Sequence, residues 1–149
     1  MVTIIPSYVY SIFAALIVGT IIVTSCSVSM MTLRNEAKSR QLVNIDEYVA
    51  SQSLNLITQA TENGQNTTQF LDLPSQIGNQ EYSISLIGDS ASAWVESGFG
   101  PSVQSQPQIY IPAEVNASGT FISGWGRPFL QCFLENQTVT LTLTSEGLN

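Results

Sequence analysis

The chain has 149 residues, a length typical of one domain, and 44% of them are apolar, as in an ordinary globular protein. Its charge is unevenly spread: residues 1–33 have no Asp, Glu, Lys or Arg, whereas residues 41–149 have ten carboxylates and one cation, Arg127, and a net charge of −9. This acidic region repels phosphate backbones, so no nucleic-acid partner is expected.

Without histidine the chain lacks the usual ligands of a zinc site. Its two cysteines, Cys26 and Cys132, are expected to be small buried side chains rather than the two halves of a disulfide.

Residues 4–31 form an apolar segment that is long enough to cross a bilayer, which takes about 20 residues at 1.5 Å each. A cleaved secretion signal is disfavoured, because its apolar core is only about 7–15 residues long and follows basic residues. Hydroxyl side chains interrupt the segment, and we expect them to bond to carbonyls of the same helix. The small residues Ala14, Ala15 and Gly19 let another helix approach closely, which a solitary lipid-facing anchor tolerates but does not need.

The helical pattern continues beyond this segment as an amphipathic stripe. Apolar residues recur at intervals of three, four and seven: Leu42, Ile45, Val49, Leu56 and Ala60, widened by Ala50, Leu54 and Ile57. Gly64, in the polar stretch "ENGQNTT", is the first residue that favours a helix end. The pattern predicts one helix from about Pro6 to about Thr61, roughly 80 Å long. The adjacent carboxylates Asp46 and Glu47 diverge by about 100°, and both are expected on the solvated face.

After Asn66 the pattern becomes alternating and rich in turn residues, which is typical of β-strands. Six or seven short strands are predicted, in the stretches "QFLDLP", "EYSISLIG", "AWVESG", "QIYIP", "TFISG", "PFLQCFLE" and "TVTLTLT". In the last of these, Val139, Leu141 and Leu143 face one way and the threonines the other, so one side of this strand is buried. The spacing favours a small antiparallel sandwich or barrel, whose core is expected to take most of the aromatic residues: Trp94, Phe99, Tyr110, Phe121, Trp125, Phe129 and Phe133.

Catalytic, cofactor and metal sites are not predicted. The "GDS" stretch at Gly88 to Ser90 is similar to a lipase nucleophile block, but a serine nucleophile needs a base, usually histidine, and the chain has none. An Asp-Ser step between two strands favours a turn instead. The carboxylates of the β-region are scattered and lack the dense pattern of a calcium loop. An enzyme is therefore not expected.

Three N-x-S/T sequons, at Asn66, Asn116 and Asn136, are possible N-glycosylation sites and favour a β-region outside the cell. The basic residues that follow the apolar segment, Arg34, Lys38 and Arg40, point the other way, because the positive-inside rule would place the β-region in the cytoplasm. Two interpretations reconcile these signals. Either residue 1 follows a basic leader that is removed or lacking here, or carboxylates such as Glu36 and those of neighbouring subunits compensate the cluster.

The opening "PSYVY", followed by "ALIVGTIIVTS" and then "LRNEAKSRQL", resembles the type IV pilin-like proteins, in particular those of archaea. Weaker similarity in "LDLPSQIGNQEYSI", "WVESGFG" and "YIPAEVNASGTFISG" extends the resemblance over most of the chain. The resemblance implies a long N-terminal helix, a β-rich head, and export by an ATPase-driven assembly machine on a membrane platform. It also implies a filament core of bundled helices. Ile5 stands where bacterial pilins usually carry Glu, which archaeal relatives commonly lack.

The sequence thus predicts an α+β protein with a hydrophobic helix (1–33), its amphipathic continuation (34–62) and a β-rich head (68–149). The expected function is that of a structural subunit, a glycosylated homopolymer forming an extracellular adhesive filament, inserted in the cytoplasmic membrane before assembly. The residues expected to pack in the filament core are Pro6, Tyr8, Tyr10, Phe13, Ala14, Ala15, Leu16, Gly19, Ile22 and Cys26. The alternative is a membrane-anchored minor pilin, or a binding module whose head recognises a surface or cell-envelope ligand.

Overall fold

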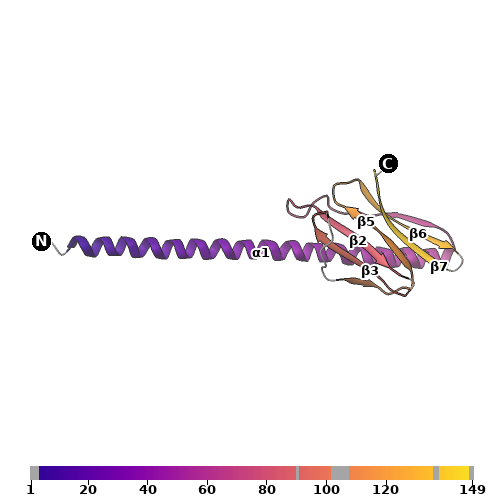
Figure 1. The fold of residues 1–149 in the computed structure, drawn as a ribbon, viewed down its shortest axis with the longest axis horizontal. Helices are drawn as coiled ribbons and strands as arrows, with labels where there is room; N and C mark the ends of the chain where they lie inside the picture. Colours follow the sequence, from indigo (N-terminus) through magenta and orange to yellow (C-terminus); the bar gives the residue numbers. More distant parts are fainter. Residues whose placement is uncertain (1–3, 90, 102–107, 136–137, 148–149) are drawn as a thin grey trace. The chain divides into compact units, whose positions relative to one another are not determined.

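The computed structural model describes residues 4–89, 91–101, 108–135 and 138–147 (Figure 1). The chain divides into two units, Met1–Ala37 and Lys38–Asn149. One helix and seven strands follow each other along the described residues: α1 (Ile4–Asn63), β1 (Thr67–Phe70), β2 (Tyr82–Gly88), β3 (Ala93–Phe99), β4 (Ile109–Ile111), β5 (Asn116–Ile122), β6 (Arg127–Glu135) and β7 (Thr138–Glu146). The predicted α+β class, with a long N-terminal helix before a β-region, is confirmed.

Helix α1 ends at the first glycine that follows Gly19 in the sequence. Gly64 adopts a left-handed backbone conformation, with φ of 63°, and its N–H donates a hydrogen bond to the carbonyl of Ala60 at 2.9 Å. Glycine adopts this conformation without the steric cost that a Cβ would add, so it stops the helix and caps its last turn. The predicted end near Thr61 is therefore correct to within two residues.

The seven strands form one sheet in the order β1-β6-β7-β5-β2-β3-β4. All neighbouring strands are antiparallel except β5 and β7, which run parallel. The sheet is open, with β1 and β4 at its edges, rather than a sandwich of two sheets or a closed barrel. A second sheet is not needed, because the C-terminal part of α1 lies along one face of this sheet and covers it (Figure 1).

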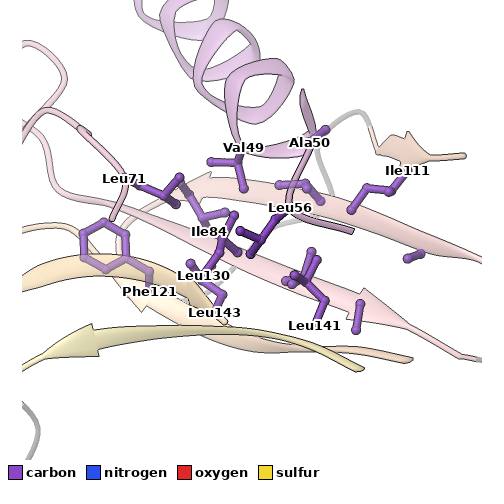
Figure 2. Packing of buried hydrophobic residues seen from close by; sticks show 14 of the residues in the cluster. Val49, Ala50, Leu56, Leu71, Ile84, Ile111, Phe121, Leu130, Leu141 and Leu143 are labelled. Carbon is purple, nitrogen blue, oxygen red and sulfur yellow. The ribbon is translucent and has the colours of Figure 1, made fainter. Parts of the chain in front are cut away.

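The core of Lys38–Asn149 lies between α1 and the inner face of the sheet, which we define as the face that α1 covers. The predicted apolar stripe of the helix is buried, apart from the half-buried Leu54. Val49, Ala50 and Leu56 lie with side chains from several strands in this core (Figure 2). Strand β7 alternates as expected, with Leu141 and Leu143 buried. Cys132 is buried in the same core, as expected, and neither cysteine forms a disulfide. The expectation of a buried Cys26 is wrong for the single chain, because this part of α1 has no covering layer there and Cys26 is exposed.

Two strands begin two or more residues before the stretch that the sequence predicts. Strand β1 begins at Thr67, two residues before the predicted stretch, and β5 begins at Asn116, four residues before "TFISG". The first half of β5 contains Asn and Gly, which are poor strand formers. It is held in the sheet because all four of its residues pair with β7, and Ser118 and Gly119 also pair with β2 on the other side.

Gly119 marks the closest approach between the parallel strands β5 and β7. Its φ is 129°, and a Cβ at this position would lie 2.1 Å from the carbonyl oxygen of Leu143. Only glycine avoids both the strained backbone and the steric clash.

We therefore expect Gly119→Ala to destabilise the head by about 2 kcal/mol or more, measured by urea unfolding. Gly100→Ala is a suitable control, because its backbone is also left-handed but no atom lies within 4 Å of its Cβ position. An equal loss in both variants would contradict the close-approach explanation.

Candidate functional site

The surface of α1 in the first unit is apolar and uncovered. Every side chain from Tyr8 to Ala37 is exposed in the single chain, including large apolar ones such as Phe13 (60% exposed) and Leu16 (61% exposed). By length and composition this helix is able to cross a membrane, and none of its apolar stretch is buried. A contiguous apolar surface of this extent is rarely left in water.

The residues predicted to pack in a filament core lie on different sides of this helix. At 100° per residue, Tyr8, Ala15, Gly19, Ile22 and Cys26 fall within roughly 60° of one another and share one face. The other predicted residues lie around the rest of the circumference: Tyr10, Phe13, Ala14 and Leu16. All nine are exposed, and the side chain of Pro6 lies outside the described residues. The apolar surface therefore surrounds the helix rather than forming a single stripe.

An open groove on this helix coincides with its smallest side chains. It is lined by Ala15, Leu16, Gly19, Thr20, Val23 and Thr24. A Cβ placed on Gly19 would meet no atom within 4 Å, so in the single chain the space above this glycine is empty. Small residues in such a position expose the helix backbone to a close neighbour.

Four hydroxyl groups in the first half of α1 bond to carbonyls of the same helix, as expected for this segment. Thr20 donates to the carbonyls of Leu16 (3.0 Å) and Ile17 (2.8 Å), and Thr24 donates to the carbonyl of Thr20 (2.7 Å). Ser27 and Thr32 make the same kind of bond. Because these groups need no water, the surface suits either lipid or another apolar helix.

Two of the three predicted glycosylation sites lie on the described surface. Asn66 is exposed, and its side-chain oxygen accepts a hydrogen bond from the backbone N–H of Leu134 at 3.3 Å, which leaves the amide nitrogen for a linkage. Asn116 is exposed at the start of β5. Asn136 lies outside the described residues.

The connection between β2 and β3 is held at Asp89, whose backbone N–H donates a hydrogen bond to the carbonyl of Ser92 at 3.0 Å. Asp89 accepts hydrogen bonds on Oδ1 from the backbone N–H groups of Ala91 and Ser92, both at 3.0 Å. These two bonds lower the pKa of the Asp89 carboxyl. Ser90 lies outside the described residues. Within the described ranges, no three Cys, Asp or Glu side chains are grouped so that they could hold a metal ion.

Asp46 does not lie on the solvated face, as the sequence analysis expected; it is 1% exposed and points at the sheet. Ser97 on β3 donates its hydroxyl to Asp46 Oδ2 at 2.5 Å, while Oδ1 has no hydrogen-bond partner. Burial raises the pKa of this carboxyl to about 6, an effect that the Ser97 bond partly offsets. The expectation failed because Asp46 follows Ile45 directly and precedes Val49 by three residues, inside the apolar stripe. Glu47 is exposed, as expected.

The predicted aromatic core is also corrected. Phe121 is buried, and Tyr82 is buried beside it in edge contact. By contrast, Tyr110 is 63% exposed and Trp125 is 54% exposed, and the remaining four are half-buried: Trp94, Phe99, Phe129 and Phe133. Strand alternation explains the outcome, because Trp94 and Tyr110 each stand between two residues that face the core.

A comparison of the chain with protein-family models, curated proteins and solved structures finds no match.

The buried Asp46 predicts an unusual pH dependence. Because the folded state raises the pKa of this carboxyl from 3.8 to about 6, the folded state binds the proton more tightly than the unfolded state. The contribution of Asp46 to stability is thus full below pH 3.8, falls between pH 3.8 and 6, and stays reduced by about 3 kcal/mol above pH 6. We expect Asp46→Asn to be more stable than the parent at pH 7.5, with an advantage that vanishes near pH 3.5.

The measurement is urea unfolding of the full chain in detergent across this pH range, monitored by tryptophan fluorescence. Glu47→Gln, at the exposed neighbouring position, is the control and should follow the parent profile. Parallel pH profiles for Asp46→Asn and the parent would show that the carboxyl is ionised in the folded state at no cost.

Proposed function

We propose that the chain is a structural subunit of an extracellular filament of the archaeal type IV pilus kind. In this proposal the first half of α1 from each copy packs into a helical core, and the β-sheet units face outward. The observation that carries it is the apolar surface of residues 8–33, which is exposed around the whole helix. A filament core needs such a surface, because every side of a core helix meets another helix.

A solitary membrane anchor is the nearest competing function, since lipid also covers an apolar helix. The groove at Ala15, Gly19 and Thr20 favours helix neighbours over lipid alone. Glycine in a helix interior costs about 1 kcal/mol relative to Ala, and close packing of another backbone against it offsets this cost. Lipid tails, being flexible, give no such preference for a small residue.

The proposed assembly is open-ended. A helix whose circumference contacts different parts of its neighbours makes heterologous contacts, and such contacts extend into a helical filament when the rotation between neighbours does not close into a ring. Before assembly the same surface is held in the cytoplasmic membrane. An assembly ATPase and a membrane platform, as in the pilin-like proteins, then move it from lipid to the filament.

The second candidate is a membrane-anchored minor pilin or binding module with its head outside the membrane. It is favoured by one feature, a group of outward-facing aromatic and polar side chains on β3 and β4, such as Tyr110. A surface of this composition suits ligand binding rather than assembly. The two candidates differ in the expected state of the chain: a filament subunit is found in sheared, detergent-free polymers, and an anchored module stays with the membrane.

Gly19 provides the sharpest test of the filament proposal. In the single chain Gly19→Leu adds a side chain where no atom lies within 4 Å of the Cβ position, so it leaves the helix intact and raises its intrinsic helix propensity. If neighbouring helices fill this space, the same change must block their approach. We expect Gly19→Leu to reduce the yield of sheared filaments at least tenfold, or to change their diameter, as seen by negative-stain electron microscopy.

The matched control is Gly19→Ala, which adds one methyl group at the same position and should be milder. Ala15→Arg, on the same face, should abolish filaments, because it places a charge in an apolar contact. Normal filaments from both Gly19→Leu and Ala15→Arg, with membrane levels of the chain unchanged, would mean that this helix face does not build a core.

A further inference from the structure

The outer face of the sheet, opposite α1, carries two parallel rows of side chains at its β4 edge. The register pairs Trp94 with Ile87 on one neighbouring strand and with Tyr110 on the other, which gives a row from β2 to β4. Glu96 pairs with Ser85 and lies beside Gln108, which gives a second row next to the first. Residues that pair directly across strands point to the same face, so each row forms one continuous surface.

The first row is apolar and open to solvent. Tyr110 is 63% exposed and Ile87 is 38% exposed, while Trp94 is half-buried between them. The rings of Trp94 and Tyr110 are in contact, with centroids 6.2 Å apart and planes inclined at 51°. Three strands at a spacing of about 4.8 Å make this row roughly 10 Å long. It is a solvent-facing apolar strip that the core does not require.

The second row is polar, and its side chains are fixed by hydrogen bonds. Glu96 Oε1 accepts from the Trp94 indole N–H at 2.7 Å and from the Gln108 side-chain N–H at 2.5 Å. Tyr110 donates its hydroxyl to Gln108 Oε1 at 3.2 Å. The network crosses from one row to the other and holds both aromatic rings in place. Such side chains lose little conformational entropy when a ligand binds.

The network leaves both donors and acceptors for a ligand. None of the bonds above uses Glu96 Oε2, the second N–H of Gln108 or the lone pairs of the Tyr110 hydroxyl. A purely cationic group would use only the acceptors, and an anion would be repelled by Glu96 and by the acidic head. A ligand with hydroxyl groups uses both kinds, because each hydroxyl donates and accepts.

We propose that these five residues, Tyr110, Trp94, Ile87, Gln108 and Glu96, form a binding platform for a neutral saccharide. A sugar ring has C–H groups on its faces and hydroxyls at its rim. One face rests on the apolar row of the platform, and the hydroxyls along one edge bond to the polar row. This binding site is independent of the filament proposal, since it needs only the folded head and works equally in a monomer.

The test uses the full chain as a monomer in a detergent that has no sugar headgroup. The probes are neutral trisaccharides built from glucose, mannose, galactose or N-acetylglucosamine, titrated with tryptophan fluorescence and calorimetry as readouts. At least one probe should bind and change the Trp94 signal. Tyr110→Ala removes a stacking ring and Glu96→Ala removes an acceptor, and each should weaken binding at least tenfold while circular dichroism remains that of the parent.

Trp125→Ala is the matched control, because Trp125 is another exposed aromatic residue, in the turn between β5 and β6. Its affinity for the probe should be that of the parent. Binding should also be the same in 0.05 and 0.5 M NaCl, since a neutral ligand makes no screened charge pair. The proposal fails if no trisaccharide binds, if binding survives both platform variants, or if oligolysine binds the platform more tightly than any sugar. A failure of this kind leaves filament assembly untouched, and filament loss in Gly19→Leu leaves sugar binding untouched.

Discussion

The apolar stripe of α1 between Leu42 and Ala60 packs on the inner face of the sheet, and the rest of the head is arranged around this contact. A sheet with one apolar face must bury that face against another layer. Here the second layer is the chain's own helix, so the strands form a single open sheet. The same contact determines which side chains face outward, because successive side chains of each strand point alternately to the inner face and to the outer face of the sheet. The outward positions of Trp94, Glu96 and Tyr110 follow from this alternation.

The same helix has a different character before the head begins. From Tyr8 to Ala37 its side chains are exposed, and the first two thirds of this stretch are apolar on every side. The helix thus changes from a surface that needs apolar neighbours all round to one that needs them on one side only. This change occurs near Arg34, Lys38 and Arg40, where the first charged residues appear. Lys38 already belongs to the head, where its ammonium group donates to the side-chain oxygen of Gln80 at 3.1 Å. In a filament subunit, the single helix α1 would then both pack in the filament core and hold the sheet of the head.

Local patterns in the sequence locate most of the helix and strands, but they do not determine how the strands pair. The helix end at Gly64, the buried stripe and the alternation in β7 follow from residue spacing alone. The parallel pairing of β5 with β7 could not be predicted, because it joins segments whose local patterns are compatible with several partners. The first half of β5 was missed for the same reason, since pairing on both sides outweighs its poor strand propensity.

For two groups of residues, the spacing in the sequence indicated the observed positions although the residue types suggested different ones. Asp46 and Ser53 complete the three- and four-residue spacing of the apolar stripe, and both are buried. Their spacing indicated a buried position, although their polar side chains suggested an exposed one. Trp94 and Tyr110 alternate with core-facing residues, so their outward direction was present in the pattern, but their size suggested a core. In both cases the periodicity was a better guide than residue type. The small residues that line the apolar groove on α1 can be recognised in the sequence, whereas the hydrogen-bond network around Glu96 can be seen only once the fold is known.

The reactivity of Cys26 tests most directly whether copies of this helix cover one another. Cys26 is exposed on the apolar face that it shares with Ala15 and Gly19, whereas Cys132 is buried in the head and serves as an internal reference. A water-soluble maleimide is applied to sheared, detergent-free material and to the detergent monomer, and each site is quantified by peptide mass spectrometry. In detergent-free polymers Cys26 should be as unreactive as Cys132, and both should be labelled after denaturation. Full labelling of Cys26 in the polymer, or recovery of the chain only with lipid or detergent, would contradict a core built from these helices.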